Sequence, residues 1–392
     1  MAERTDVAIV GGAVMGSAVA YFLARDPDFD GTITVVERDP AYAACATTRS
    51  WGGIRQQFST AENVRMSLFG AEFVRAAPQA LSVEGQMPDL AFNERGYLFL
   101  ADADQIGGIE ANCAAQRALG AAVVVLWPDE IAARFPWLDL AGLAGAGFGL
   151  RNEGWIDPEA LLHGLRRKAL SLGVRYLADS VLGVALDGGR VVGLDLRAGG
   201  RIDSGAVVDA AGPFAAAIAA MAGIALPVRP RKRMSYVFDC RTEISGAPLT
   251  VDCTGVTFRP EGRRFIAIAS PAADNDPDCE DLDEDTSDFD TTVWPALARR
   301  VPAFAAIKLV GAWAGHYDFN TFDQNAILGP HPEIGGFYFC NGFSGHGIQQ
   351  APAAGRAIAE HIVHGGYRSL DLSRLGFARV LENRPLREAH VV

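Results

Sequence analysis

A strand, a glycine-rich turn and a helix near the N-terminus constrain this chain more than any other feature of its sequence. Residues 6–10 form a short apolar run, and residues 14–23 carry apolar side chains at helical spacing. A second apolar run over residues 32–36 ends in Glu37, and the turn reads Gly11-Gly12-Ala13-Val14-Met15-Gly16. Strand, turn, helix, strand and acid in this order predict a βαβ unit that binds a dinucleotide.

Each position of the turn has a physical task. Gly11 makes the tight turn, Gly16 lets the helix pack on the strand, and Ala13 adds a methyl group where the motif has a second glycine. The helix N-terminus offers free N–H groups to the phosphates. A carboxylate at Glu37 accepts a hydrogen bond from a ribose 2′-hydroxyl and repels a 2′-phosphate, which disfavours NADP. A glycine-rich turn in an ordinary βαβ crossover is the alternative, and the motif alone does not separate FAD from NAD.

Composition excludes several classes of protein. The chain has 392 residues, with 35 basic and 47 acidic side chains, a net charge of −12 and 49% hydrophobic residues. This profile is typical of a folded globular protein, and the length allows two domains. The acidic balance disfavours nucleic acid and anionic membranes as partners. The sequence has no apolar run of about 18 residues and no signal-peptide layout, so we expect no integral membrane segment and a cytoplasmic location.

The cysteines and histidines show no metal-binding pattern. The six cysteines include no Cys-x-x-Cys pair, so we expect all six to be reduced. His361 and His364 lie three residues apart near a predicted helix end, with nothing to pair with them. Zinc needs three or four ligands, so we predict no metal site.

The rest of the chain leaves the βαβ pattern and returns to it near the C-terminus. Residues 273–290 hold ten Asp and Glu and are predicted to form a solvated loop. The alternation of patterns predicts interleaved domains rather than tandem ones. Strands are predicted at residues 97–101, 122–126, 228–238 and 250–258. Residues 206–213 are predicted to form a strand that ends in a tight turn. Helices are predicted at residues 63–75, 158–172 and 349–364.

Several longer runs resemble the D-amino-acid oxidase superfamily of flavoproteins, which includes sarcosine oxidases, glycine oxidase and D-amino-acid dehydrogenases. The resemblance covers essentially the whole chain. It rests on the N-terminal fingerprint, on residues 46–50 and 52–58, and on the late run Gly342-Phe343-Ser344-Gly345-His346-Gly347. Residues 155–158, 230–233 and 314–325 are similar to a sarcosine-oxidase-like subgroup, which has a mitochondrial member linked to the assembly of a respiratory complex.

The resemblance implies an α/β (α+β) fold in which a Rossmann-like FAD-binding domain is interleaved with an antiparallel-sheet substrate domain. The FAD-binding domain takes residues 1–90, 150–220 and 315–392, and the substrate domain takes residues 91–149 and 221–314. The cofactor-binding residues that the fingerprint and the resemblance together predict are Gly11, Gly12, Ala13, Met15, Gly16, Glu37, Arg38, Thr47, Thr48, Arg49, Val181, Ala211, Gly212, Gly342, Gly345, His346, Gly347 and Ile348.

Reduction of a flavin places negative charge on its ring, and positive charge nearby stabilises this state. Gly345-His346-Gly347 precedes a predicted helix whose N-terminus supplies a positive end, although an ordinary loop-to-helix junction is the alternative. His346 is a candidate general base, but the resemblance places it in the flavin environment. His316 falls near where some sarcosine oxidases carry a cysteine bound to flavin; no such attachment through histidine is known at this place, so we predict non-covalent FAD.

A substrate carboxylate is best held by the planar fork of an arginine. Arg55 is our first candidate for this contact and Arg49 our candidate for active-site charge, with a surface or phosphate contact as the alternative for either. Many sarcosine oxidases have a lysine soon after Gly-His-Gly, where this chain reads Ile348-Gln349-Gln350. This departure weakens the prediction of sarcosine itself as substrate.

The leading hypothesis is an FAD-dependent enzyme that oxidises the C–N bond of an N-substituted glycine, an imino-diacid, an opine-like compound or a D-amino acid. A scaffold role in respiratory-complex assembly and a flavin 2-hydroxy-acid dehydrogenase are the alternatives. The strand placed at residues 264–269 lacks the lysine that helps oxygen accept electrons, unless Arg263, Arg264 or Arg49 replaces it. The acceptor is therefore left open between O₂ and a quinone or electron carrier, and an oligomer is compatible with the sequence.

Overall fold

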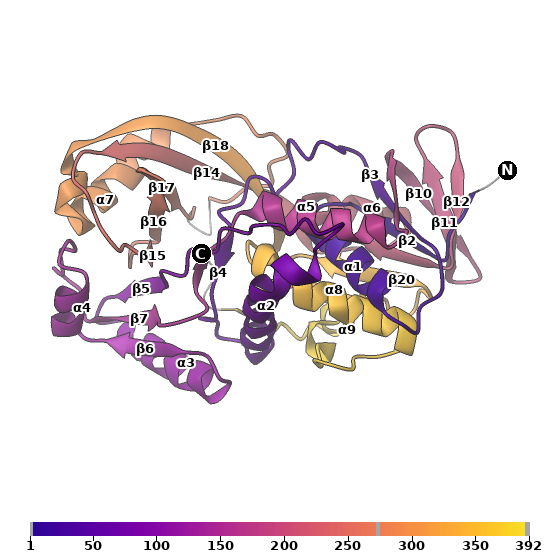
Figure 1. Cartoon of the computed structure of the whole chain (residues 1–392), viewed down its shortest axis with the longest axis horizontal. Helices are drawn as coiled ribbons and strands as arrows, with labels where there is room; N and C mark the ends of the chain where they lie inside the picture. The colour runs from indigo at the N-terminus through magenta and orange to yellow at the C-terminus, as the bar shows by residue number, and fades with distance from the viewer. Residues whose placement is uncertain (1–2, 272–274, 389–392) are drawn as a thin grey trace.

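A six-stranded sheet forms one half of the molecule. The structure is a computed structural model and describes residues 3–271 and 275–388. The sheet has the strand order β19-β20-β13-β2-β3-β9, and only the β19–β20 pair is antiparallel. Its strands are β2 (Val7–Val10), β3 (Ile33–Glu37), β9 (Arg175–Ala178), β13 (Ala206–Asp209), β19 (Ile327–Pro330) and β20 (Phe337–Asn341) (Figure 1).

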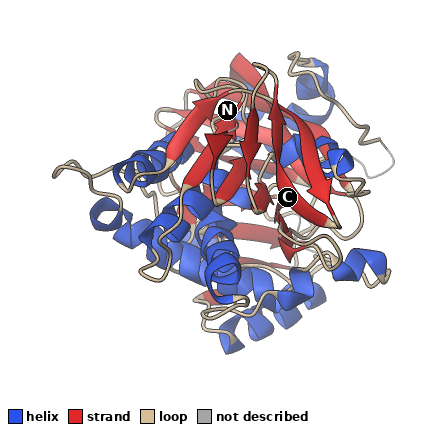
Figure 2. Cartoon of the chain, turned by 90° about the vertical axis from the view of Figure 1, so that its right-hand side faces the viewer, coloured by secondary structure: helices blue, strands red, loops and turns tan. Residues whose placement is uncertain are grey.

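Both faces of this sheet are covered, which explains the unbroken apolar runs of its strands. Val7 and Ile9 of β2 pack with helices α1 (Val14–Arg25), α5 (Pro158–Ser171) and α8 (Gly347–His364). Ala8 and Val10 point the other way, toward α6 (Ala215–Met221) and a four-stranded sheet. That smaller sheet contains β1 (Glu3–Arg4), β12 (Arg201–Asp203), β11 (Arg190–Leu196) and β10 (Val181–Asp187). Figure 2 shows most of the helices on one side of the strands.

An eight-stranded sheet forms the other half, at the left of Figure 1. Its order is β18-β14-β17-β16-β15-β5-β7-β6, and only the β15–β5 pair is parallel. The strands are β5 (Tyr97–Ala101), β6 (Val123–Leu126), β7 (Gly145–Gly149), β14 (Val228–Cys240), β15 (Leu249–Val251), β16 (Val256–Glu261), β17 (Arg264–Ala269) and β18 (Ile307–Asn320). Helices α3 (Ile106–Ala118), α4 (Pro128–Arg134) and α7 (Trp294–Arg300) accompany it.

The interleaved α/β fold is confirmed, because the strands of each large sheet come from segments separated by strands of the other. The exact domain boundaries stay predictions. β18 runs without a break through residue 315, where the sequence placed a boundary. Helix α2 (Ala61–Ala80) and the short pair β4 (Gly53–Ile54) and β8 (Gly154–Trp155) lie between the two halves (Figure 1), and α9 (Ala378–Leu381) is the last helix in the described part of the chain.

Two predicted elements were wrong in extent. The single strand expected at residues 250–258 is two strands, because Asp252 makes a tight turn: its Oδ2 accepts the Thr254 N–H at 3.0 Å and its carbonyl accepts the Gly255 N–H at 2.9 Å. The helix expected at 63–75 runs from Ala61 to Ala80 and includes Pro78. The α5 start was right: the Asp157 side chain accepts hydrogen bonds from the Glu159 and Ala160 N–H groups.

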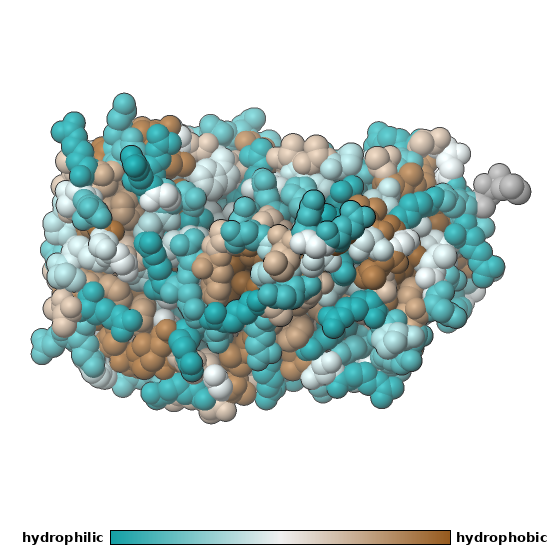
Figure 3. All heavy atoms as spheres, viewed as in Figure 1, coloured by the Kyte–Doolittle hydropathy of each residue, from teal (hydrophilic) through white to brown (hydrophobic). Residues whose placement is uncertain are grey.

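The surface is mostly polar. Hydrophilic residues cover much of the face in Figure 3, and the hydrophobic residues lie in separate patches. Within the described residues, no helix is both long and apolar enough to cross a membrane. All six cysteines lie in the described part of the chain, and all are free.

Candidate active site

A cavity of about 480 Å³ lies where the two large sheets meet. The ends of β2, β3 and β13 and the first turns of α1 and α8 line it on one side. Residues of β14, β16, β17 and β18 line it on the other side. Carboxyl ends of parallel strands are the usual place for a ligand in such a sheet.

One end of the cavity is built by the N-terminal βαβ unit. Glu37 ends β3, its Oε2 accepts the Gly12 N–H at 2.7 Å, and its Oε1 accepts the Asp39 N–H at 2.8 Å. Val181 opens β10 at the same end, and the Arg38 guanidinium lies 4.0 Å from the centre of the Phe214 ring. The carboxylate therefore fixes the glycine turn as well as facing the cavity.

The glycine turn is packed too tightly for a larger residue at one position. A Cβ on Gly16 would lie 1.8 Å from the Gly11 carbonyl oxygen, so α1 begins in direct contact with the turn. Ala13 precedes the helix, the Thr47 hydroxyl accepts the N–H of Val14 at 3.3 Å, and in the described chain no acidic residue occupies the first turn. The positive end of α1 therefore faces the cavity.

The other end of the cavity lies at the start of α8. Gly345 has φ +94°, and a Cβ there would lie 2.5 Å from the Tyr317 ring. His346 precedes the helix without a side-chain cap, and again no first-turn acid is present among the described residues. The first turns of α1 and α8 thus both line one cavity and carry no acidic residue among those described, which suits a diphosphate at α1 and the electron-rich edge of a flavin at α8. The residues present fit FAD.

The loop after β3 is tied to both halves of the molecule. The Thr47 hydroxyl accepts the Val14 N–H at 3.3 Å, and the Thr48 hydroxyl donates to the Tyr42 carbonyl at 2.7 Å. The Arg49 Nη1 donates to the Ala314 carbonyl of β18 at 2.8 Å. Arg49 lines the cavity, so it is no ordinary surface arginine.

Arg55 is buried at the wall of the cavity, with 2% of its surface exposed. Its Nη2 lies 3.1 Å from His346 Nε2, its Nη1 donates to the Gln57 carbonyl, and its guanidinium lies 4.0 Å from the centre of the Phe58 ring. Burial lowers the pKa of Arg55, and the nearby Tyr97, Glu388 and Glu153 oppose this shift. An arginine stays cationic under such conditions.

The same contact defines the state of His346. A guanidinium only donates, so Nε2 accepts and the imidazole proton sits on Nδ1. Burial, together with the Arg55 charge, lowers the pKa of His346 to about 3. A neutral imidazole whose Nε2 lone pair faces Arg55 is poorly suited to act as a general base from that nitrogen.

Gln349 and Gln350 lie where many sarcosine oxidases have a lysine, and both form hydrogen bonds within the protein. Gln349 Oε1 accepts the Arg55 backbone N–H at 2.6 Å, and Gln350 Nε2 donates to Asn63 Oδ1 at 3.2 Å. Both contacts join the start of α8 to the segment that carries Arg55. The sequence flagged the missing lysine but gave no signal for these contacts.

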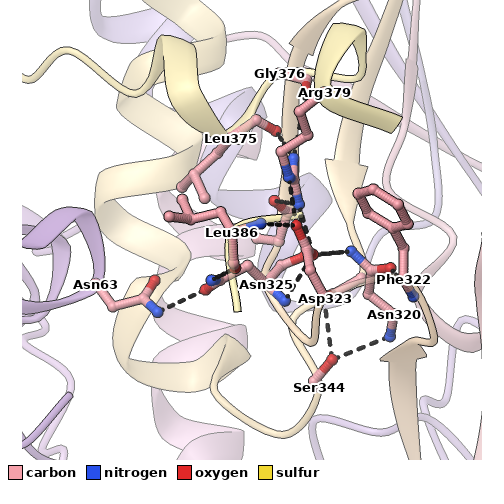
Figure 4. A network of polar contacts seen from close by, with 12 residues as sticks. Asn63, Asn320, Phe322, Asp323, Asn325, Ser344, Leu375, Gly376, Arg379 and Leu386 are labelled. Carbon is pink, nitrogen blue, oxygen red and sulfur yellow. Dashed lines mark hydrogen bonds and ion pairs between the residues drawn. The ribbon is translucent and has the colours of Figure 1, made fainter. Parts of the chain in front are cut away.

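A buried polar network explains part of the run 314–325 that the sequence singled out. Arg379 holds both Asp323 oxygens, at 2.7 and 3.0 Å, and the Asn320 N–H donates to Ser344 Oγ at 3.0 Å (Figure 4). Asn63 Nδ2 donates to Asn325 Oδ1 at 2.6 Å. The network joins β18, α2, the loop before α8 and the C-terminal segment.

Glu388 reaches the start of α2 from that C-terminal segment. Its carboxylate accepts the N–H and hydroxyl of both Ser59 and Thr60, at 2.6 to 3.1 Å, and the Asn63 amide at 3.0 Å. Burial opposes its ionisation, but these donors hold the pKa of Glu388 well below its usual range. Glu388 was not among the residues predicted from the sequence.

The structure brings most of the predicted residues together. Arg49, Arg55, His316 and His346 all line the cavity. Gly12 and Gly16 support the turn from behind, Thr48 points toward a second hollow, and Gly342 packs against Val228 and Asn320. The predicted cofactor residues that line the cavity are Gly11, Ala13, Met15, Glu37, Arg38, Thr47, Arg49, Val181, Ala211, Gly212, Gly345, His346, Gly347 and Ile348.

Several lining residues of the eight-stranded sheet were missed. They come from five different strands, so no short motif contains them. Alternation of polar residues on β14 was the available signal, because Arg233 and Ser235 face the same side. The missed residues include Tyr97, Ser235, Leu249, Thr257 and Ile268.

Three smaller expectations need correction. Arg263 and Arg264 do not line the cavity; both are exposed, and Arg264 Nε pairs with Asp239 Oδ1 at 3.0 Å. His364 is not unpaired, since its Nε2 lies 3.4 Å from Asp26 Oδ2 and the two groups come within 4.8 Å of an Asp28 oxygen. His361 instead packs edge-on against Tyr367.

Comparison with known proteins agrees with this geometry. A family model described as FAD dependent oxidoreductase matches residues 6–361. The chain is 41% identical over 425 residues to FAD-dependent oxidoreductase domain-containing protein 1 of Xenopus laevis, covering 100% of this chain and 85% of that protein. It is 25% identical to sarcosine oxidase subunit beta of Rhodobacter capsulatus, covering 99% and 91%. L-proline dehydrogenase from P. horikoshii superposes with a TM-score of 0.85 at 25% identity, covering 98% and 100%.

Proposed function

Because the chain belongs to the FAD dependent oxidoreductase (DAO) family and is therefore an FAD-dependent oxidoreductase, we propose that it oxidises the C–N bond of an amino acid or secondary amine. Bound FAD supplies the hydride acceptor. The substrate class includes N-substituted glycines, imino-diacids, opine-like compounds and D-amino acids. The observation that carries the proposal is the buried Arg55 guanidinium at the cavity wall.

Arg55 is suited to hold the substrate carboxylate. Its guanidinium is cationic and buried, and the Gln349 contact fixes its backbone at 2.6 Å. The Phe58 ring and His346 leave it little freedom to reorient. A fixed fork loses little entropy when it binds a carboxylate, which orients the α-carbon toward the start of α8.

The protonation states of the cavity favour an amine over a 2-hydroxy acid. A hydroxyl group needs a base to take its proton, whereas an amine needs only its neutral form. Burial raises the pKa of both Tyr97 and Tyr317, so these phenols stay protonated, and His346 Nε2 faces Arg55. Tyr97, Tyr317 and His346 therefore offer no base for a hydroxyl proton, which supports amine oxidation.

The electron acceptor follows from the charges near the flavin end. Among the described residues that line the cavity there is no lysine, and β17 contributes Ile268. Arg263 and Arg264 do not line the cavity, and Arg49 Nη1 is held by the Ala314 carbonyl, so we propose that a quinone or electron carrier reoxidises the flavin faster than O₂. Stopped-flow mixing of the reduced enzyme with air-saturated buffer or with a soluble quinone measures the two rates.

Anaerobic flavin reduction tests the main proposal. The FAD-loaded protein is mixed with a panel of amino acids, imino acids and 2-hydroxy acids, and the flavin absorbance is followed. Bleaching by an amino or imino acid supports the proposal, and bleaching only by 2-hydroxy acids assigns the other dehydrogenase class. No bleaching by any compound supports the scaffold hypothesis. Acid precipitation that releases the flavin into the supernatant tests the predicted non-covalent binding.

A further inference from the structure

The acidic segment expected to be a solvated loop covers one edge of β14. This segment begins with residues 273–274, which lie outside the described part. β17 pairs with β14 only at residues 235–238, while β18 pairs along its whole length. The open edge before residue 235 is covered by residues 275–283, and the Cys279 N–H donates to the Pro230 carbonyl at 2.9 Å. Many side chains of this segment are exposed, but it is attached to the strand.

Its acids pair with the basic run of β14. Asp278 lies 3.2 Å from Arg231, and Asp281 lies 2.6 Å from Lys232. His316 Nε2 lies 3.1 Å from the Asp281 carbonyl oxygen, so the segment also contacts β18. The positive charge of this basic run is thus largely neutralised.

One of these pairs differs from the others because its arginine lines the cavity. Arg233 Nη1 and Nη2 donate to the two Asp276 oxygens at 2.7 and 2.8 Å, a bidentate pair. The side chains of Arg233 and Asp276 are only 8% and 13% exposed. The Arg233 guanidinium lies 5.0 Å from the centre of the Tyr317 ring.

The charges of two arginines act on the phenol of Tyr317. The charges of Arg233 and Arg55 both oppose the burial that raises the pKa of the Tyr317 phenol. The cavity wall therefore contains two guanidinium groups near one ring. Arg233 has a carboxylate on its fork, and Arg55 is the residue proposed to hold the substrate carboxylate.

We propose that Asp276 is a specificity-determining residue that restricts the substrate to one carboxylate, which narrows the proposed class to N-substituted glycines and D-amino acids and removes imino-diacids and opine-like compounds from it. This inference rests on the proposed function. By holding both donors of Arg233, Asp276 removes the second carboxylate site that two arginines would otherwise make. A dicarboxylic amino acid must then either break the bidentate pair or place its second charge beside the Asp276 anion, and both are unfavourable.

The rest of this wall suits an uncharged group. Ser235 and Thr257 contribute hydroxyls, and Leu249 and Ile268 contribute apolar surface. Thr257 Oγ1 is buried and has no hydrogen-bond partner among the described residues. The part of the substrate that lies away from the carboxylate held by Arg55 is therefore small and uncharged. A polar atom on this part would form a hydrogen bond with Thr257.

The test compares Asp276→Asn with Asp278→Asn in the FAD-loaded full chain. Asn keeps the size of Asp276 and removes its charge, while Asp278 sits on the same segment but pairs with Arg231, which does not line the cavity. Binding of acetate, succinate, N-methylglycine and iminodiacetate is measured from perturbation of the flavin absorbance, and anaerobic reduction is measured for the two amines. Asp276→Glu, which keeps the charge, is the conservative variant.

We expect Asp276→Asn to shift the dicarboxylate-to-monocarboxylate affinity ratio about 10- to 100-fold toward the dicarboxylate, since a charge-assisted pair becomes available. Asp278→Asn and Asp276→Glu keep the wild-type ratio. An unchanged ratio in Asp276→Asn overturns the inference, as does an equal shift in Asp278→Asn, which would indicate general loosening of the segment. Asp276→Ser replaces the Asn variant if that protein does not fold.

Failure of the proposed function gives a different result. If no amine reduces the wild-type flavin, the C–N oxidation proposal fails, while acetate and succinate binding still tests the role of Asp276 without turnover. If the wild type is reduced by monocarboxylic amines and the ratio does not move, only the role of Asp276 is wrong.

Discussion

The two sides of the cavity are built in opposite ways. On the cofactor side, a single stretch from Gly11 to Glu37 supplies the turn, the helix N-terminus and the acid. On the substrate side, the lining residues come from β5, β14, β15, β16, β17 and β18, which are scattered between residues 97 and 320. Binding through backbone and glycine spacing is local in sequence, whereas binding through side chains on an antiparallel sheet is not.

A substitution in the glycine turn, on the cofactor side of the cavity, should have the largest effect on FAD binding and stability. Gly16→Ala places a methyl group 1.8 Å from the Gly11 carbonyl oxygen, so α1 must move away from the turn. We expect loss of bound FAD and destabilisation by about 1–3 kcal/mol, as for overpacked interiors. Flavin absorbance per mole of protein and thermal unfolding measure both.

Gly107→Ala is the matched control for this change. Gly107 lies in α3 with no described atom within 4 Å of its added Cβ. Alanine favours a helix, so this variant should keep FAD and gain about 0.5–1 kcal/mol of stability. Full FAD retention by Gly16→Ala would show that the tight packing is not needed for binding.

On the substrate side, Arg55→Lys should have the next largest effect. Lysine keeps the charge but loses the two parallel donors, which are worth about 1.5–3 kcal/mol, so KM should rise roughly 10- to 150-fold. Steady-state kinetics on the amine identified by flavin bleaching measure this. Arg264→Lys, an exposed arginine on β17, is the control and should leave KM unchanged. Equal kinetics for both variants would assign the carboxylate to another residue.

A smaller effect is expected at the acid of the βαβ unit. Glu37→Lys removes the acceptor of the Gly12 and Asp39 N–H groups and places a cation where a ribose hydroxyl needs an acceptor. FAD affinity should fall about 10-fold, the loss of one charged hydrogen bond. Titration of the apoprotein with FAD, followed by fluorescence, gives the Kd. The exposed Glu110→Lys in α3 controls for net charge, and an unchanged Kd would remove Glu37 from the site.

The smallest effect concerns the pH dependence of His346. Its pKa of about 3 lies below the ordinary value of 6.5, so it should be neutral throughout pH 5–8 and add no inflection near 6.5 to kcat/KM. The folded state disfavours the imidazolium, so this group costs stability as pH falls below 6.5. His346→Asn should therefore lessen the decrease of Tm between pH 6.5 and 4. An inflection near 6.5 that His346→Asn abolishes would restore His346 as a base candidate.

The contrast between the two sides of the cavity also explains which features could be predicted from the sequence and which could not. The βαβ unit, the start of α5 at Asp157 and the start of α8 after Gly345 were predictable, because caps, glycine spacing and apolar periodicity are local. The Asp252 turn was missed because Asp252 and Gly255, which are turn-forming residues, lie between two short β-branched runs that were interpreted as one strand. The pairing of Asp276 with Arg233 was missed because composition predicts exposure but not which cation an acid meets.

The contact between Glu388 and the start of α2 has a consequence for biosynthesis. Glu388 and Ser59 lie 329 residues apart, and synthesis proceeds at roughly 5–20 residues per second. The segment that follows Arg55 therefore waits on the order of 20–60 s for the carboxylate that holds it. Contacts between residues this far apart in sequence form slowly. The N-terminal βαβ unit therefore emerges from the ribosome long before Glu388 can bind the segment that follows Arg55.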